Sequence, residues 1–78
     1  MEYEKRIEEL SAAIDASPKA PELYIERGKL FYSANEFGRA LNDFLKALEL
    51  DPEAEQARQF IKMTNEILAF RHKDLYNP

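Results

Sequence analysis

Apolar residues near the N-terminus recur at intervals of four, three and four. The recurring positions are Tyr3, Ile7, Leu10 and Ile14. This spacing places them on one stripe of an α-helix, whereas the charged residues between them face water. The pattern therefore predicts a helix over residues 2–16. Pro18 ends this helix, because proline cannot donate the backbone hydrogen bond that a continuing helix needs.

A second helix is predicted from Pro21 to Ser33. Its apolar positions are Leu23, Tyr24, Leu30 and Phe31. Pro21 suits the first turn of a helix, and Asn35 tolerates the left-handed conformation that often ends one. Gly28 lies inside the helix at a cost of about 1 kcal/mol relative to Ala. We expect a neighbouring helix to approach closely at this glycine, because a missing side chain permits shorter distances between helix axes.

A third helix should run from about Phe37 to Leu50. Small and large residues alternate on its apolar face, which consists of Ala40, Leu41, Phe44, Ala47 and Leu48. Asp51 is a good N-cap and Pro52 a good first helical residue. Together they are predicted to end this helix and begin the next.

The fourth helix is predicted to reach about His72. Its apolar stripe is Ala57, Ile61, Thr64 and Leu68. We expect one domain over residues 1–72 and a C-terminal tail over residues 73–78, which carry no periodicity. Asp74 is the only residue at metal-ligand spacing from His72. A histidine is favourable near the negative end of a helix dipole, so the presence of His72 needs neither a metal nor a catalytic role.

The first and third helices are similar to each other at a distance of 34 residues. Pro18 and Pro52 are 34 residues apart. The same shift aligns Ile7 with Leu41, Leu10 with Phe44, Ala13 with Ala47, and Ile14 with Leu48. A period of this length indicates a repeat made of two helices.

Residues 21–54 resemble the tetratricopeptide repeat, a unit of two helices with signature residues at fixed offsets. Seven of the eight signature positions agree in chemical class: Tyr24, Gly28, Phe31, Ala40, Phe44, Ala47 and Pro52. Arg27 is the exception, because the family has Leu there. Residues 1–18 resemble only the second helix of a preceding repeat, and residues 55–72 only the first helix of a following one.

This resemblance implies an all-α fold of four antiparallel helices with right-handed superhelical packing. It also implies a protein-protein interaction module, whose second and fourth helices line a concave face for a peptide or a partner helix. The residues that the resemblance places on this face are Ile25, Lys29, Tyr32, Ser33, Gln56, Gln59, Phe60, Met63 and Ile67. Lys29 and Tyr32 suit a carboxylate or a carbonyl group, while the apolar members suit hydrophobic contact. Phe60 and Met63 are equally consistent with the core.

The first helix lacks the partner helix that a complete repeat would supply. Part of its apolar stripe is therefore expected at the surface, where it would mark an interface. A homodimer formed through this terminal helix would cover the stripe, and a self-associating structural protein is the alternative function. In a monomer, the aliphatic stems of Lys5 and Arg6 would cover it instead.

Charge and composition narrow the classes of function. Fifteen acidic and eleven basic residues give a net charge of -4, which opposes attraction to nucleic-acid phosphates. The chain has no cysteine, and it shows no signal peptide, no apolar run long enough to span a membrane and no phosphate-binding, nucleophile or metal motif. We expect a cytoplasmic protein that is not an enzyme and takes no cofactor. Its partner is expected to be another protein, with no nucleic acid or membrane involved.

Overall fold

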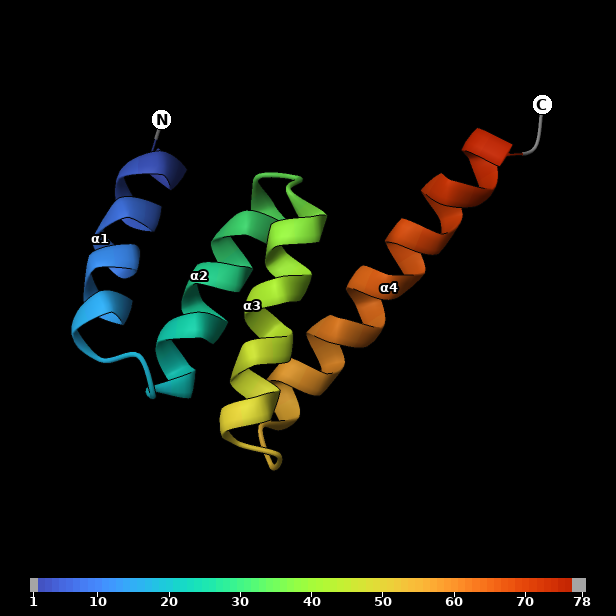
Figure 1. Ribbon diagram of the computed structural model, residues 1–78. Helices are drawn as coiled ribbons and strands as arrows, with labels where there is room; N and C mark the ends of the chain where they lie inside the picture. The colour runs from blue at the N-terminus through green and yellow to red at the C-terminus, as the bar shows by residue number, and fades with distance from the viewer. Residues whose placement is uncertain (1, 77–78) are drawn as a thin grey trace.

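Four helices in antiparallel succession form the stack (Figure 1). The computed structural model describes the backbone of residues 2–76 and the side chains of residues 2–70. The helices are α1 (Glu2–Ala16), α2 (Pro21–Ser33), α3 (Phe37–Leu50) and α4 (Glu55–Tyr76). Each helix packs against the next one in the sequence, and the contact between α2 and α3 is the largest. The predicted all-α stack is confirmed.

The turn between α2 and α3 follows the prediction made from Asn35. Asn35 has a φ of 64°, in the left-handed region. Its N–H donates to the carbonyl oxygen of Tyr32 at 3.1 Å, and the N–H of Glu36 donates to that of Phe31 at 2.8 Å. This Schellman pattern satisfies carbonyl groups at the end of α2 and turns the chain into α3.

The start of α4 differs from the prediction. α4 begins at Glu55, and Pro52 lies in the preceding turn rather than at the first helical position. Asp51 is extended, with a φ of -139° and a ψ of 94°. Its Oδ1 accepts a hydrogen bond from the N–H of Glu53 at 3.0 Å. Asp51 therefore closes a turn of its own instead of capping α4, because local bonding to the backbone competes with helix capping.

The end of α4 also differs, since the helix continues to Tyr76 instead of ending near His72. Residues 73–76, which we expected in a tail, are helical, and residues 77–78 lie outside the described residues. No proline or glycine occurs between Pro52 and Pro78. Without such a residue to break it, the helix continues although its apolar periodicity has stopped.

The core consists of two adjoining clusters between the helices. One contains Ile14, Tyr24, Ala47 and Ala57, and the other contains Phe31, Ala40 and Phe44. Phe44 is fully buried and stacks on Phe60 of α4, with ring centroids 4.9 Å apart and planes inclined by 17°. The side chain of Phe44 therefore connects α3 with α4.

Gly28 marks the close approach of α2 and α3. A Cβ atom added to Gly28 would lie 2.7 Å from Cε1 of Phe44. Carbon atoms in favourable contact are about 3.5–4.0 Å apart, so the ring leaves no room for a methyl group. The close approach that the sequence predicted at this position is confirmed.

α1 packs on α2 through its predicted apolar stripe. Leu10 and Ile14 are buried, with exposed fractions of 3% and 6%, and Ile7 is half-buried. Tyr3 is the member of the stripe that stays exposed, at 39%. α2 therefore covers most of the surface that we expected to find open on α1.

Gly28→Ala should lower the free energy of unfolding by up to about 2 kcal/mol. The new methyl group overpacks the contact with Phe44, and this outweighs a gain of about 1 kcal/mol in helix propensity. Urea denaturation followed by circular dichroism measures the change. Gly38→Ala is the matched control, because nothing lies within 4 Å of its added Cβ. Equal stability of the two variants would contradict the close approach at Gly28.

Candidate partner-binding face

The expected binding residues lie on α2 and α4, and the structure brings part of them together. Tyr32 of α2 meets Phe60 of α4 edge to face, with ring centroids 5.4 Å apart. Tyr32 and Met63 line one hollow together with Ile67. The remaining residues expected on this face do not line the hollow; Ile25 packs against the core, and Lys29, Ser33, Gln56 and Gln59 are exposed.

The hollow lies between the end of α2 and the middle of α4. It has a volume of about 400 Å³ and is lined by Tyr32, Met63, Glu66, Ile67 and Phe70. Met63 and Phe70 have exposed fractions of 42% and 68%. Large apolar side chains gathered at an open hollow are typical of an interaction site.

Aromatic contacts hold the floor of the hollow. The ring of Tyr32 lies edge-on to Phe37 at 5.2 Å as well as to Phe60. Phe60 in turn stacks on the buried ring of Phe44. Edge-to-face and stacked contacts between aromatic rings are favourable beyond the burial of their surface. They therefore hold the rings of Tyr32 and Phe60 in place. Phe60 thus belongs largely to the core, whereas Met63 faces solvent.

Sequence reasoning missed two residues of this hollow, Glu66 and Phe70. A signal for Phe70 was present, because Phe60, Met63, Ile67 and Phe70 follow one another at intervals of three, four and three. This is a second helical stripe on α4, beside the core stripe that contains Ala57 and Thr64. Glu66 carries no comparable signal, since an acidic residue is ordinary on the surface of a helix.

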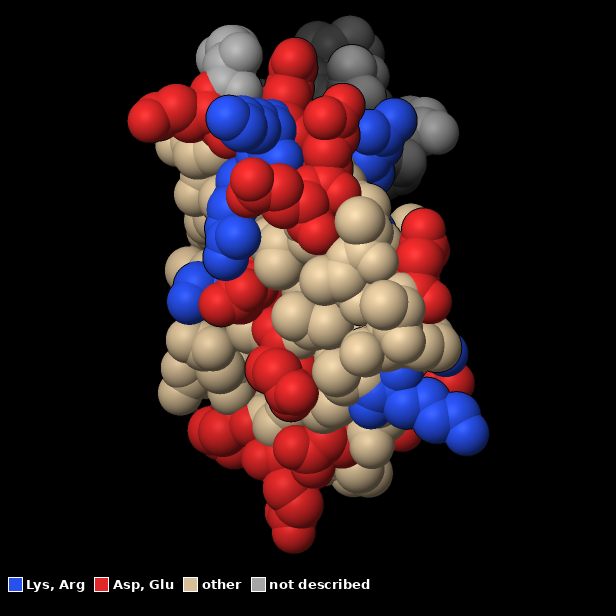
Figure 2. Space-filling model, turned by 90° about the vertical axis from the view of Figure 1, so that its left-hand side faces the viewer, with Lys and Arg blue, Asp and Glu red and all other residues tan. Residues whose placement is uncertain are grey.

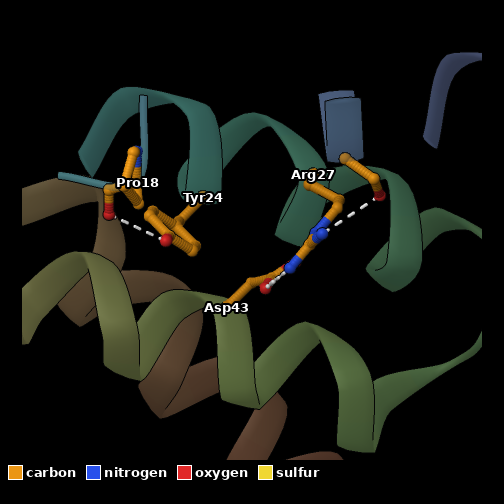
Figure 3. Close-up of polar contacts among 5 residues, drawn as sticks. Pro18, Tyr24, Arg27 and Asp43 are labelled. Carbon is orange, nitrogen blue, oxygen red and sulfur yellow. Dashed lines mark hydrogen bonds and ion pairs between the residues drawn. The ribbon is translucent and has the colours of Figure 1, made fainter. Parts of the chain in front are cut away.

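Arg27, the departure from the repeat signature, joins three helices (Figure 3). Its Nε and Nη2 donate to Oδ2 and Oδ1 of Asp43 on α3 at 2.8 and 2.7 Å. Its Nη1 donates to Oγ of Ser11 on α1 at 3.0 Å. Asp43 is only 4% exposed. The hydrogen bonds from Arg27 to Asp43 raise the pKa of the guanidinium group, which therefore stays charged.

The two repeat prolines are held by equivalent contacts. The hydroxyl group of Tyr24 donates to the carbonyl oxygen of Pro18 at 2.8 Å (Figure 3). Nη2 of Arg58 donates to the carbonyl oxygen of Pro52 at 2.6 Å. Tyr24 and Arg58 are 34 residues apart, as are the two prolines. The period of the sequence is therefore also a period of hydrogen bonds, although the donor side chain has changed.

Known proteins point to the same repeat. Residues 21–54 match the model of the family described as tetratricopeptide repeat. The chain is also 35% identical over 74 residues to UDP-N-acetylglucosamine–peptide N-acetylglucosaminyltransferase of Giardia intestinalis, an alignment that covers 94% of the chain but 5% of that protein. No solved structure matches the chain significantly. Residues 21–54 therefore form one tetratricopeptide repeat, which comprises α2 and α3 with the turns that follow them.

The described residues contain neither a membrane-spanning helix nor a metal site. No helix among them is long and apolar enough to cross a membrane. No group of three or more histidine, cysteine or acidic side chains within the described part could hold a metal ion. The side chain of His72 lies outside the described residues.

Arg27→Leu, which introduces the residue typical of the family, should lower the free energy of unfolding by about 3 kcal/mol. The loss arises because the buried carboxylate of Asp43 is left without its cation. The double variant Arg27→Leu, Asp43→Asn should recover at least about 1 kcal/mol, since a neutral amide is less costly to bury. Urea denaturation of the two single variants and the double variant tests this. Simple addition of the two single losses would show that the residues are not coupled.

Proposed function

We propose that this chain is a non-catalytic protein-protein interaction module that binds a peptide or a partner helix on the face formed by α2 and α4. Tetratricopeptide repeats generally mediate interactions between proteins, and helical repeats use such concave faces for binding. The observation that carries the proposal is the exposed apolar hollow beside Tyr32. Met63 and Phe70 together offer a partner the kind of desolvated contact that dominates binding energy.

Polar residues on the same two helices supplement this contact. Lys29 of α2 and Gln59 of α4 are exposed. They would bind carboxylate and backbone groups of a partner, in the way that a polar rim surrounds the apolar centre of an interface. Ile25 is half-buried and would extend the apolar part of the face.

We extend the proposal to the class of partner and the place of action. The partner is another protein rather than a nucleic acid or a membrane, and the net charge of -4 supports the first exclusion. The chain spans 5% of the length of the transferase that it resembles. A match of this length gives no support for the glycosyl-transfer activity in that protein's name. We propose that the chain acts in the cytoplasm and without a cofactor.

Homodimerisation through α1 is the alternative function. Figure 2 views the molecule from the α1 side and shows charged side chains at both ends of this face and through its centre, beside an uncharged area on the right. The exposed ring of Tyr3 supports the alternative, but the burial of Leu10 and Ile14 leaves little apolar surface for it. A stable interface usually buries about 800 Å² on each partner. Light scattering that gives the monomer mass of 9.1 kDa at high concentration would exclude this alternative.

The double variant Lys29→Glu, Tyr32→Ala should reduce partner binding at least tenfold, because it reverses one charge and removes the floor of the hollow. The immobilised chain captures proteins from cell lysate, and mass spectrometry quantifies each captured protein for wild type and variant. Circular dichroism verifies that the variant is folded.

The matched control is Lys5→Glu, Tyr3→Ala, which makes the same two kinds of substitution on α1. It should capture the same proteins as the wild type. Loss of capture by the α1 variant, with normal capture by the α2 variant, would count against the proposed face and in favour of α1.

A further inference from the structure

The hollow belongs to an apolar stripe along the middle of α4. Phe60, Met63, Ile67 and Phe70 have the alternating spacing of three and four residues that coiled coils use at their contact positions. Phe60 packs against the core, whereas Met63 and Phe70 are 42% and 68% exposed. In Figure 1 the outer part of α4 leaves the stack, and no other helix runs along it.

We infer that this stripe binds an amphipathic helix of a partner protein that carries a basic residue next to its apolar seam. The inference rests on the proposed function and names the partner class for the same face. A helix presents its own apolar side chains at the same alternating spacing. The two seams can therefore interlock over the roughly 15 Å between Phe60 and Phe70.

Glu66 determines the charge that suits this partner. It lines the hollow together with the apolar residues of the stripe, and it directly precedes Ile67. In a coiled coil this is a position that flanks the seam and selects the partner by charge. Glu66 is exposed and makes no ion pair with any side chain that the structure describes. A lysine or arginine beside the partner's seam would pair with it.

A second copy of this chain fits the stripe less well. If two α4 helices paired antiparallel about the middle of the stripe, between Met63 and Ile67, each Glu66 would lie close to Glu66 of the other copy. Like charges at flanking positions oppose such pairing. A net charge of -4 on each copy adds to the repulsion.

Two synthetic helical peptides test the inference. Both contain about three heptads with Leu at the two seam positions, and they differ only in having Lys or Glu at the flanking positions. Fluorescence anisotropy with the full chain measures both affinities. The Lys peptide should bind at least tenfold more tightly than the Glu peptide at low salt, and the difference should shrink as salt screens the charges.

Glu66→Lys should reduce this preference about three- to tenfold, which is the range expected for reversing one exposed charge pair. Glu8→Lys on α1 makes the same change of net charge away from the hollow, and it should keep the preference. Equal effects of the two substitutions would overturn the inference, because net charge alone would then explain the preference. Binding that survives Met63→Ala, Phe70→Ala would also overturn it, because the peptide would lie elsewhere.

Failure of the inference can be distinguished from failure of the proposed function. If neither helical peptide binds, but the Lys29→Glu, Tyr32→Ala variant still loses its captured partners, the helix partner is excluded and the binding face stands. If neither peptide binds and the Lys29→Glu, Tyr32→Ala variant captures the same proteins as the wild type, both the further inference and the proposed function are wrong. Analytical sedimentation could instead show that the wild-type chain is a dimer and that Phe70→Ala is a monomer. In that case the occupant of the stripe would be a second copy of this chain and not a partner helix.

Discussion

The ring of Phe44 fills the space that Gly28 leaves between α2 and α3, and the rest of the stack is arranged around this contact. The ring is fully buried and also stacks on Phe60, so one side chain joins three helices. Protein interiors pack as densely as organic crystals, and a rigid ring at this point therefore sets both the distance between α2 and α3 and the place where α4 crosses them. Tyr32 then lies against Phe60 and forms the floor of the hollow.

The ion pair between Arg27 and Asp43 restrains how α2 and α3 are oriented relative to each other. A buried ion pair contributes little net stability, but an arrangement that breaks it leaves a charge unpaired, at a cost of several kcal/mol. The bond from Arg27 to Ser11 extends the same restraint to α1. The proposed binding face therefore has a floor held by the core and a rim of exposed side chains. Met63 suits such a rim, because methionine adapts to the shape of a partner.

Most of the fold follows from local signals. α2 and α3 have the predicted bounds, because hydrophobic periodicity, Pro21 and Asn35 act within one or two turns of the residues that they influence. The wrong start predicted for α4 arises from a choice between two local options. Asp51 can either cap a helix or close a turn, and only its backbone conformation decides between them. Of the residues that the sequence placed on the proposed binding face, Tyr32, Met63 and Ile67 line the hollow, whereas Glu66 and Phe70 line it without having been predicted.

The sequence by itself determined four helices, a 34-residue repeat and the need for close packing at one glycine, because these depend on spacing along the chain. Only the tertiary structure decided the role of Arg27, since Asp43 lies 16 residues away and no local pattern signals a pair at that distance. It also decided that Phe60 faces the core while Phe70, on the same stripe, faces solvent. The physical reason is that burial depends on which helices lie beside a stripe, and α2 ends at Ser33, beside the inner half of α4.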